Sequence, residues 1–535
     1  MTPVETSAGR IPAALAGAVA AGVSLGVAEL VTGIAGEGPS LVSALGTEFI
    51  DRFAGSLKDL AVDLFGTNDK PALVVGIVVV SLALGAVFGV VASRRFWLGA
   101  AGFVLFGLVG VWAYRRDPFG STGTAVVASV IGVATGIAAL WYLLRLAAPS
   151  EAVSAPATDD GVAAPGGAIT PAPRAPATGT PRRTFIVGAA ALGVGAAASA
   201  ALGRRLRPAN PAESARRTVT IPRPTRSTPA PSSQPFAVPG LSPYATPNDD
   251  FYRIDTALIV PQIDVGDWRL RVTGLVDHEF TIDYDELLSL DAVEETVTLQ
   301  CVSNEVGGDL VGNAVWQGVP LEVLLDRAGV QDSATQLVGR SLDDWTAGFP
   351  TELARDGRVA MVAYAMNGEP LPVTHGFPAR LIVAGLYGYV SATKWLNEIE
   401  LTTWEGFDGY WITRGWAKEG PIKTASRIDV PRRSTTVPAG RTAVAGVAWA
   451  PTRGIERVEL QVDALEWQEC RLGDVASDNT WVQWLYEWDA TPGDHVLTVR
   501  ATDGTGETQT SEIASPIPDG ATGWHSRRVT VDGAG

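Results

Sequence analysis

The stretch Val297-Thr298-Leu299-Gln300-Cys301-Val302-Ser303-Asn304-Glu305 joins a short apolar segment to a polar loop. The pattern at residues 296–299 predicts a β-strand. Cys301 opens the loop that follows, where a reactive group can be held on rigid support. On these residues alone three interpretations stay open: a buried structural cysteine, a disulfide with Cys470, or a thiolate that acts as a metal ligand or nucleophile.

Cysteine and histidine are scarce in the rest of the chain, which has 535 residues but only two Cys and four His. Two cysteines cannot build a multi-cysteine zinc module, an all-cysteine iron–sulfur cluster or a disulfide-stapled scaffold. No Cys-x-x-Cys-His motif attaches a c-type haem, and no Gly-x-Ser-x-Gly elbow indicates a serine hydrolase. We therefore expect neither haem nor an iron–sulfur cluster in this chain.

Charge divides the chain into two unlike parts. Residues 1–234 carry 19 Lys and Arg against 13 Asp and Glu, a net charge of +6, whereas residues 235–535 carry 22 against 44, a net charge of −22. A domain this acidic repels nucleic acid and anionic lipid surfaces. Nucleic acid is therefore not an expected partner.

The first part is predicted to cross a membrane. Spanning the ~30 Å hydrocarbon core takes about 20 apolar helical residues. Five runs have this character, and they are Ile11–Ile34, Ala72–Ala92, Phe96–Trp112, Thr124–Leu146 and Thr184–Leu202. In the loop at residues 35–71, apolar residues recur at helical spacing from Phe49 to Phe65, which predicts a helix lying on the bilayer surface.

The positions of arginine predict the orientation of these spans. Arg94-Arg95, Arg145 and Arg182-Arg183 mark three cytoplasmic connections, and the acidic loop at residues 35–71 belongs outside. Only Arg115-Arg116 disagrees. The prediction is a multi-pass protein of the cell membrane with a cytoplasmic N-terminus, a four-span region at 1–147, and a catalytic C-terminal half outside the cytoplasm.

The fifth span, residues 182–207, begins within Thr180-Pro181-Arg182-Arg183-Thr184-Phe185-Ile186. This segment resembles a twin-arginine export motif, which serves proteins that take up a cofactor before they cross the membrane. The alternative is ordinary positive charge at the start of a span. Composition also predicts an Ala/Pro-rich cytoplasmic linker at 148–181 and a Pro-rich extended tether at 208–240.

The acidic part is predicted to hold two domains. Short strands at 267–274, 296–299, 359–363, 380–383 and 398–402 alternate with helices at 284–289 and 321–328, which indicates an α+β domain over 241–430. Strands at 442–449, 458–462, 481–488, 495–501 and 527–531 follow without a helical run, which indicates a β-sandwich over 431–535. The predicted fold class is therefore multi-domain: a transmembrane helical bundle, an α+β domain and an all-β sandwich.

Several segments of the α+β domain resemble one known family, in the family's own order, over residues 243–430. They are Thr246–Tyr252, Leu299–Cys301 with Asn304, Ala314–Leu321, Tyr364–Pro372, His375–Leu381, Lys394–Leu396 with Ile399, and Tyr410-Trp411-x-x-Arg414. Together they look like the sulfite oxidase family of molybdenum enzymes. The final sandwich likewise resembles the family's C-terminal immunoglobulin-like domain, so the likeness covers most of the acidic part.

The resemblance implies a molybdenum–molybdopterin cofactor that performs two-electron oxygen-atom transfer. Cys301 matches the residue whose sulfur binds molybdenum beside the pterin dithiolene, as suits a soft thiolate. By the same resemblance, Asn304, Trp316 and Tyr410 belong to the catalytic pocket. The alternative for Trp316 is a place in the apolar core, and Cys470 has no family counterpart and is interpreted as structural.

The pterin contacts implied by the resemblance are His375, Arg380 and Lys394, with Asp249, Tyr252, Arg253 and Ser341 matching less firmly. A phosphate-bearing pterin requires cationic and hydrogen-bonding partners when it is buried. The three firmer matches keep alternatives: a turn residue for His375, a strand-end ion pair for Arg380, and a surface charge for Lys394.

The chain departs from the family at the substrate. Glu305 follows Asn304 where sulfite oxidases have an Arg that helps to bind sulfite, and Ile254-Asp255-Thr256 replaces their Arg-Asn-His. The loss of two cations favours a neutral substrate of the sulfoxide type over sulfite. Two alternatives remain, which are a sulfite dehydrogenase with a rearranged anion site and a metal-free cell-surface binding protein.

The expected partners follow from the same reasoning. Without haem or iron–sulfur sites, the enzyme needs a separate redox partner that carries haem or is linked to quinone. The membrane is the second partner. Because members of the family often pair through the sandwich domain, a homodimer through that domain is a further expectation.

Overall fold

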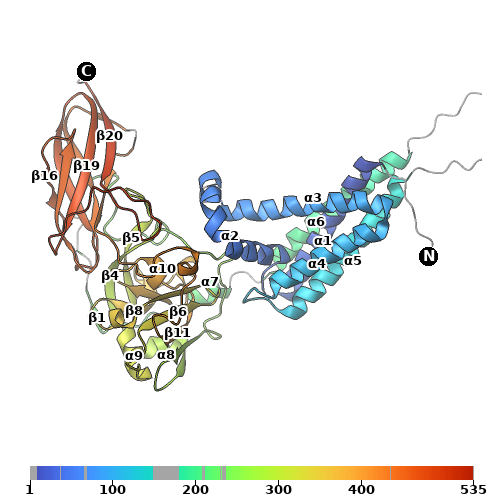
Figure 1. Ribbon diagram of the computed structural model, residues 1–535, viewed down its shortest axis with the longest axis horizontal. Helices are drawn as coiled ribbons and strands as arrows, with labels where there is room; N and C mark the ends of the chain where they lie inside the picture. The colour runs from blue at the N-terminus through green and yellow to red at the C-terminus, as the bar shows by residue number, and fades with distance from the viewer. Residues whose placement is uncertain are drawn as a thin grey trace, which may run out of the picture. The chain divides into compact units, whose positions relative to one another are not determined.

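The computed structural model describes residues 9–36, 38–65, 69–148, 180–207, 211–228, 231, 236–433 and 435–533. The chain forms two compact units, Met1–Ala209 and Asn210–Gly535, which are treated separately below (Figure 1). Nearly all of the predicted linker at 148–181 lies outside the described residues.

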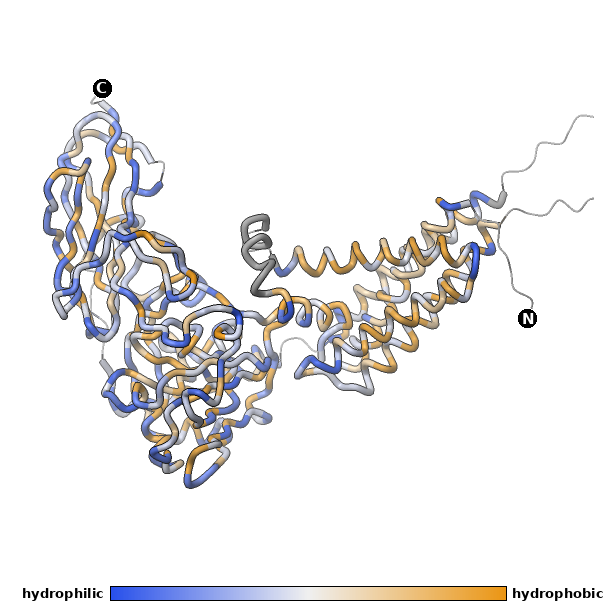
Figure 2. Tube along the Cα trace, viewed as in Figure 1, coloured by the Kyte–Doolittle hydropathy of each residue, from blue (hydrophilic) through white to orange (hydrophobic). Residues whose placement is uncertain are grey.

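The N-terminal unit consists of helices. They are α1 (Arg10–Ala35), α2 (Leu41–Phe65), α3 (Asp69–Arg94), α4 (Phe96–Tyr114), α5 (Thr122–Ala147) and α6 (Thr180–Leu206). Five of them, all but α2, are long and apolar enough to cross a membrane, and they coincide with the five predicted runs. Figure 2 shows hydrophobic residues along most of these helices. The predicted helix of the loop at 35–71 is α2, whereas its position on a bilayer surface stays a prediction.

Small residues let the helices of this unit approach closely. A Cβ atom added to Gly17 of α1 would lie 2.0 Å from the carbonyl oxygen of Gly85 in α3, and one added to Gly26 would lie 2.3 Å from that of Ala196 in α6. Further along α1, Gly33 faces Gly203 of α6 at 2.1 Å. Since apolar area drives no association within a bilayer, such backbone contact is the usual source of helix pairing there.

These contacts also establish the direction of the helices. The pairs Gly26 with Ala196 and Gly33 with Gly203 advance together, so α1 and α6 run parallel. Gly89 of α3 approaches Ala13, near the start of α1, and α5 approaches α1 in the same reversed sense. The start of α1, the ends of α3 and α5, and the start of α6 therefore share one end of the bundle.

An acid of α1 is paired near the opposite end. The Glu29 carboxylate lies 3.0 Å from Nη2 of Arg207 and 3.9 Å from Nε of Arg204. Arg207 also donates to the Thr32 hydroxyl at 3.3 Å. Charges within apolar helices are costly and are kept where a partner neutralises them, and this group links α1 to α6.

The second unit contains two sheets that form an α+β domain. One sheet has the order β1-β4-β5-β8-β10, with β9 paired to β8, and the other has the order β3-β2-β11-β6-β7. The first sheet comprises β1 (Arg226–Ser227), β4 (Val293–Gln300), β5 (Val311–Pro320), β8 (Ala360–Met366), β9 (Glu369–Pro370) and β10 (Arg380–Val383). The second comprises β2 (Arg269–Gly274), β3 (Phe280–Asp283), β6 (Gln336–Ser341), β7 (Thr346–Pro350) and β11 (Leu396–Thr402).

Short helices connect these strands where the sequence predicts them. Helices α8 (Tyr284–Ser289) and α9 (Leu321–Ala328) have the predicted bounds, and α10 (Gly388–Ser391) follows β10. The Asp283 carboxylate accepts the backbone N–H of Glu286 at 2.9 Å and so caps α8. Gly329, with a φ of 64°, ends α9 in the left-handed conformation that favours glycine.

The predicted tether at 208–240 differs from the structure over residues 211–228. Helix α7 (Pro211–Arg216) and strand β1 lie on the α+β domain, where β1 pairs in parallel with β4. The Arg216 guanidinium lies 2.8 Å from the Glu369 carboxylate and donates to the carbonyl of Pro370 at 3.0 Å. Proline-rich composition misled the prediction because proline is also tolerated at a sheet edge.

The C-terminal region forms two sheets around one core. One sheet comprises β12 (Ala425–Val430), β14 (Gly440–Trp449), β18 (Val482–Ala490) and β17 (Arg471–Leu472). The other comprises β13 (Thr436–Pro438), β20 (His525–Asp532), β19 (Gly493–Asp503), β15 (Ile455–Val462) and β16 (Gln468–Glu469). Side chains such as Trp484, Val458 and Val499 fill the space between the sheets. Since β12 begins at Ala425, the sandwich starts before the predicted boundary at residue 431.

Replacing Gly33 by valine should weaken the contact between α1 and α6, because a Cβ there meets the Gly203 carbonyl. Overpacking of this kind costs about 1–3 kcal/mol. The helical signal of the full-length protein in detergent should then melt several degrees lower than in wild type. Gly76→Val in α3 is the matched control, since no atom lies within 4 Å of a Cβ at that position. Equal melting temperatures for Gly33→Val and wild type would contradict the close approach.

Candidate active site

Cys301 lies where the sequence predicts it, directly after β4 and at the start of a loop that returns to β5. Its backbone N–H donates to the Leu310 carbonyl at 3.0 Å, which closes the loop. The Asn304 side-chain oxygen accepts the Leu310 N–H at 2.9 Å from inside the loop. Asn304 therefore shapes the loop, while its predicted catalytic role stays a prediction.

Both cysteines are free thiols, so the interpretation as a disulfide is wrong. Cys301 is 9% exposed, and its Sγ lies 2.9 Å from the Ser303 hydroxyl. Cys470 is buried in the sandwich, where burial raises the pKa of its thiol far above the ordinary value. Cys470 thus has the environment of an inert structural cysteine, and Cys301 is the thiol that stands beside polar groups.

Two tyrosines lie near the Cys301 thiol. Burial raises the pKa of Tyr252, the nearby Cys301 raises it further, and Arg380 acts in the opposite direction. Burial, with smaller contributions that include Cys301, raises the pKa of Tyr387 to about 12. Phe251 stacks on Tyr252 with a ring separation of 5.2 Å and fixes its orientation. Both phenols therefore stay protonated near neutral pH.

Arg380, at the start of β10, is a buried cation that is 4% exposed. Its guanidinium donates to the carbonyls of His375 at 3.0 Å and Ala392 at 3.4 Å, and it lies 5.1 Å from the ring of Trp316. Within the part of the chain that the structure describes, no carboxylate pairs with it. Burial lowers the pKa of Arg380 to about 10, and nearby Tyr252 opposes that shift. The predicted alternative of an ion pair is wrong, and the site has a positive charge to offer to an anion.

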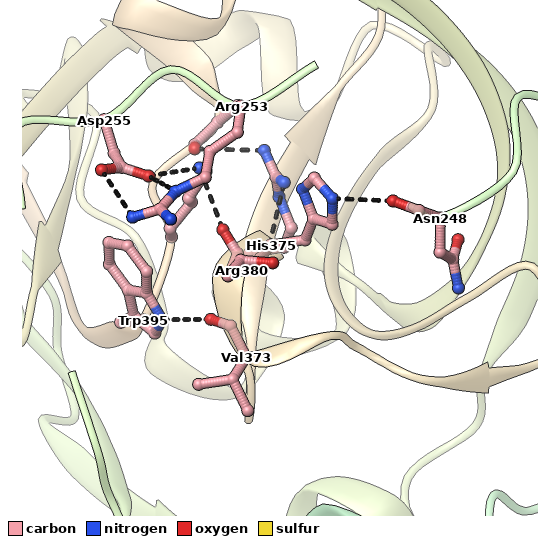
Figure 3. Close-up of polar contacts among 10 residues, drawn as sticks. Asn248, Arg253, Asp255, Val373, His375, Arg380 and Trp395 are labelled. Carbon is pink, nitrogen blue, oxygen red and sulfur yellow. Dashed lines mark hydrogen bonds and ion pairs between the residues drawn. The ribbon is translucent and has the colours of Figure 1, made fainter. Parts of the chain in front are cut away.

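His375 ends the short helix η3 (Val373–His375) and is buried beside Arg380. Burial, followed by the charges of Lys394 and Arg380, lowers the pKa of His375 to about 3, so the ring is neutral. Its Nε2 lies 3.1 Å from the Asn248 carbonyl, as Figure 3 shows. Because a carbonyl only accepts, Nε2 carries the proton and the buried, unpartnered Nδ1 is an acceptor. A partner with an N–H or O–H group would satisfy that atom.

Asp255 bridges two of the predicted pterin contacts. Its Oδ2 lies 3.0 Å from Nζ of Lys394 and 2.8 Å from Nε of Arg253 (Figure 3). Lys394 also donates to the Thr374 carbonyl at 3.2 Å. The side chains of Asp255 and Lys394 are 6% and 11% exposed. The predicted alternative of a surface charge for Lys394 is therefore wrong.

Lys394 is held in this position by its own contact with Asp255 and by the hydrogen bond of the next residue, Trp395. The indole N–H of the next residue, Trp395, donates to the Val373 carbonyl at 2.8 Å and attaches the start of β11 to η3. Burial lowers the pKa of Lys394 to about 8, while Asp255 opposes that shift. Sequence reasoning noted Asp255 only as a departure from the family, because its partner Lys394 lies 139 positions away and no local pattern signals the contact.

Two other predicted residues lie deeper than expected. Trp316 is 0% exposed in β5, and its indole N–H donates to the Val297 carbonyl at 3.3 Å. It therefore packs beneath Arg380 as part of the core and does not line an open pocket. Ser341 is buried at the end of β6, where its hydroxyl accepts the Asp343 N–H at 3.4 Å. Burial raises the pKa of Asp343, and neighbouring Asp255 adds to the rise, so Ser341 stands near the Asp255 bridge.

Two further predicted residues lie elsewhere. Asp249 is exposed in a turn, which does not support a buried pterin contact. The backbone N–H of Tyr410 donates to the Thr346 carbonyl of β7 at 3.1 Å, and the Arg414 guanidinium lies 3.6 Å from its ring. These contacts place Tyr410 at the second sheet, whereas Cys301 follows a strand of the first. A catalytic role for Tyr410 stays a prediction.

A cavity of about 340 Å³ lies beside the cysteine loop, between the α+β domain and the sandwich. Its lining includes Gln300, Asn304, Glu305, Trp449, Arg453 and Glu507. Sequence reasoning missed both cations of this lining. Arg453 lies 2.8 Å from the Asp503 carboxylate, and Lys423 lies 3.0 Å from that of Asp519. Each is therefore already paired with an acid.

Asp255→Asn should destabilise the full-length protein more near pH 6.5 than near pH 9.5. Burial places the folded pKa of Lys394 at about 8, below its ordinary 10.5, so the charged lysine costs stability below about pH 8 and Asp255 offsets that cost. Removing one partner of a buried pair costs about 3–5 kcal/mol. We expect a loss of this order in urea unfolding near pH 6.5 and a smaller loss near pH 9.5, where Lys394 is neutral.

The control for this variant is Asp326→Asn, which removes an exposed ion pair with Arg355 and should change stability little at either pH. A loss in Asp255→Asn that is equal at both pH values would contradict the role of the Lys394 charge.

Comparison with known proteins identifies the domain around this site. Residues 257–411 match the family model described as the oxidoreductase molybdopterin binding domain. Mitochondrial sulfite oxidase of Rattus norvegicus is 30% identical over 274 residues, covering 43% of this chain and 49% of the relative. The chain thus spans about half the length of that relative.

Two further proteins are similar to this chain. The uncharacterized oxidoreductase YuiH of Bacillus subtilis is 35% identical over 159 residues, covering 29% of this chain and 76% of YuiH. The solved structure of the sulfane dehydrogenase SoxCD of Paracoccus pantotrophus superposes with a TM-score of 0.49 at 22% identity, covering 55% of this chain and 85% of that one. Since most of YuiH is matched at this identity, the likeness reaches beyond isolated motifs. The chain is an oxidoreductase and belongs to the sulfite oxidase family of molybdopterin-dependent enzymes.

Proposed function

We propose that the protein is a membrane-anchored, extracytoplasmic molybdenum–pterin oxidoreductase that carries out two-electron oxygen-atom transfer on a neutral substrate of the sulfoxide type. The observation that carries the proposal is the buried Arg380 guanidinium, which has no carboxylate partner among the described residues and shares a neighbour, Tyr252, with the Cys301 thiol. A buried cation of this kind fits an anionic group that brings its own negative charge.

The residues present fit a molybdenum–pterin cofactor. Cys301 would hold the metal through its sulfur, and Arg380 would face the anionic part of the group. The free Nδ1 of His375 suits an N–H donor such as a pterin ring provides. Lys394 and Arg253, joined by Asp255, would hold a phosphate. When bound, the cofactor supplies the oxygen-atom transfer itself.

The chain's own side chains control protons and water at this site. Because burial raises the pKa of Tyr252, its hydroxyl stays protonated beside Cys301 and can donate a hydrogen bond to a polar oxygen. His375 stays neutral, so it adds no competing positive charge. Trp316 and Phe251 pack against this group and exclude water from it. In such a dry site, hydrogen bonds to developing charge are worth more than in water.

The charges near the cysteine loop support a neutral substrate. Arg453 and Lys423 line the neighbouring cavity, but Asp503 and Asp519 already neutralise them. Glu305 is exposed at the same cavity and adds a negative charge. A doubly charged sulfite anion would find no unpaired cation in this lining among the described residues. The alternative, a sulfite dehydrogenase with a rearranged anion site, is favoured by the likeness to sulfite oxidase.

The helix directions support the proposed topology. Arg10, Arg94, Arg95, Arg145, Arg182 and Arg183 belong to helix ends that share one end of the bundle. Arg115, Arg116, Arg204 and Arg205 lie at the opposite end, so the excess of arginine at the first end is small. By the positive-inside rule we assign the first end to the cytoplasm, which would put the end of α6 and all that follows outside. Arg182 and Arg183 are exposed at the start of α6, as a twin-arginine motif requires for recognition. Export after cofactor insertion is part of this proposal.

Partners complete the proposed function. The expectation of no haem or iron–sulfur site in this chain means that electrons pass to or from a separate haem-bearing or quinone-linked protein. The sandwich region, proposed to be immunoglobulin-like, is the surface through which we expect two chains to pair.

Metal analysis and turnover test the function together. Protein from a host that makes the cofactor should contain molybdenum near one atom per chain and should reduce methionine sulfoxide with a reduced dye faster than it oxidises sulfite with ferricyanide. Cys301→Ser should lower turnover at least about 100-fold, since even outer partners of a metal ligand are worth about 10–100-fold. Cys470→Ser should leave turnover unchanged because that thiol is buried in the sandwich.

Two results would count against the proposal in different ways. If the protein oxidises sulfite faster than it reduces methionine sulfoxide, the alternative of a sulfite dehydrogenase is correct. The absence of molybdenum from wild-type protein, or full turnover in Cys301→Ser, would overturn the cofactor assignment.

Labelling of intact cells tests the topology. In a background without the two native cysteines, Thr122→Cys at the start of α5 should react with a membrane-impermeant maleimide. Gly9→Cys should react only after permeabilisation. Both positions are exposed in the N-terminal unit. The reverse pattern would place the catalytic half in the cytoplasm.

A further inference from the structure

The residues just before Cys301 form hydrogen bonds with the C-terminal sandwich. The indole N–H of Trp449, at the end of β14, donates to the Gln300 side-chain oxygen at 2.7 Å, and both side chains are buried. Two residues earlier, the backbone N–H of Thr298 donates to the Asn479 carbonyl at 2.9 Å. The Thr298 hydroxyl accepts the backbone N–H of Trp481 at 2.7 Å. Strand β4 thus ends against the sandwich.

The other end of the cysteine loop, at Gly307 and Gly308, also contacts residues of the sandwich. The Arg427 guanidinium of β12 donates to the Gly308 carbonyl at 2.9 Å and lies 2.6 Å from the Asp429 carboxylate. The ring of His525 packs against Gly307 so closely that a Cβ on that glycine would lie 2.3 Å from the ring. With a φ of 78°, Gly307 adopts a conformation that also favours glycine.

The neutral ring of His525 and the strand positions of the donors make these contacts rigid. Burial, followed by the charges of Arg527 and Arg427, lowers the pKa of His525 to about 4. Its ring is therefore neutral near pH 7, and Nδ1 accepts the Ile428 N–H at 2.9 Å. The donors belong to regular strands or their immediate ends, which are the rigid supports on which a functional group is best held. Loss of one donor would leave a buried acceptor without a partner, which is costly.

We propose that the C-terminal sandwich positions the metal ligand: Trp449 and Arg427 hold the two flanks of the cysteine loop through Gln300 and Gly308, and so fix the direction and exposure of the Cys301 thiol. Both are positioning residues, since they act through the loop and not on the metal. The inference rests on the proposed function, because that function makes Cys301 a metal ligand. The exposure of the thiol can nevertheless be measured without the cofactor.

The test uses the full-length chain from a host that cannot make the cofactor, in a Cys470→Ser background where Cys301 is the remaining thiol. The probe is Ellman's reagent, and the rate of thiol modification is measured under native conditions. Trp449→Phe keeps an aromatic ring but removes the donor to Gln300, so the loop should open more often. We expect Cys301 to react about tenfold faster than in the parent.

The matched control is Trp524→Phe, which removes an indole donor to the Gln509 carbonyl in the same region without touching the cysteine loop. It should leave the rate of Cys301 modification near that of the parent. Equal acceleration by both variants would show general loosening of the sandwich and would overturn the inference. So would an unchanged rate in Trp449→Phe.

Arg427→Lys provides a second variant in case Trp449→Phe does not fold. A lysine cannot reach Gly308, Asp429 and Ser242 at once as the guanidinium does, so Cys301 modification should again accelerate. In molybdenum-loaded protein, Trp449→Phe should also shift the electron paramagnetic resonance signal of Mo(V), and Trp524→Phe should not. If wild type contains no molybdenum but Trp449→Phe still exposes the thiol, the proposed function fails and the positioning role stands.

Discussion

The second unit depends on the burial of one positive charge, that of Arg380. Moving a guanidinium out of water is costly unless something compensates it. Here the compensation comes from the carbonyls of His375, Leu381 and Ala392 and from the face of Trp316, and no carboxylate among the described residues takes part. Strand β5, helix η3 and the segment before β11 are arranged around this cation. The site is thus prepared for an anion, which is why it agrees with membership of a family that binds a pterin.

Local pattern predicted the elements that support the site. Strand β10 and helices α8 and α9 have the predicted bounds because caps, turns and apolar spacing mark them within a few residues of sequence. Cys301 could be singled out for a similar reason, as a thiol at the junction of an apolar strand and a polar loop. The family likeness then identified His375, Arg380 and Lys394, all of which the structure places in buried, polar surroundings.

Long-range contacts were beyond sequence reasoning. Asp255 acquires its role from Lys394, 139 positions away, and Trp449 acquires its contact from Gln300, 149 positions away. Nothing local distinguishes such residues from other acids or aromatics. Trp316 shows the converse, since an aromatic residue inside a family motif has the same sequence whether it lines a pocket or packs in the core. The segment 211–228 was misjudged because its composition suits both a free tether and an edge strand.

The packing of α1 has a consequence for assembly of the N-terminal unit. Its face at Gly17 meets α3, whereas the face at Gly26 and Gly33 meets α6, the last helix of the unit. In the order of synthesis, that second face and the Glu29 carboxylate have no partner until helices α2 to α5 have been made and Gly203 and Arg207 follow. The first helix is therefore completed by the last one, and the bundle can close only when the helix that leads into the second unit has been made.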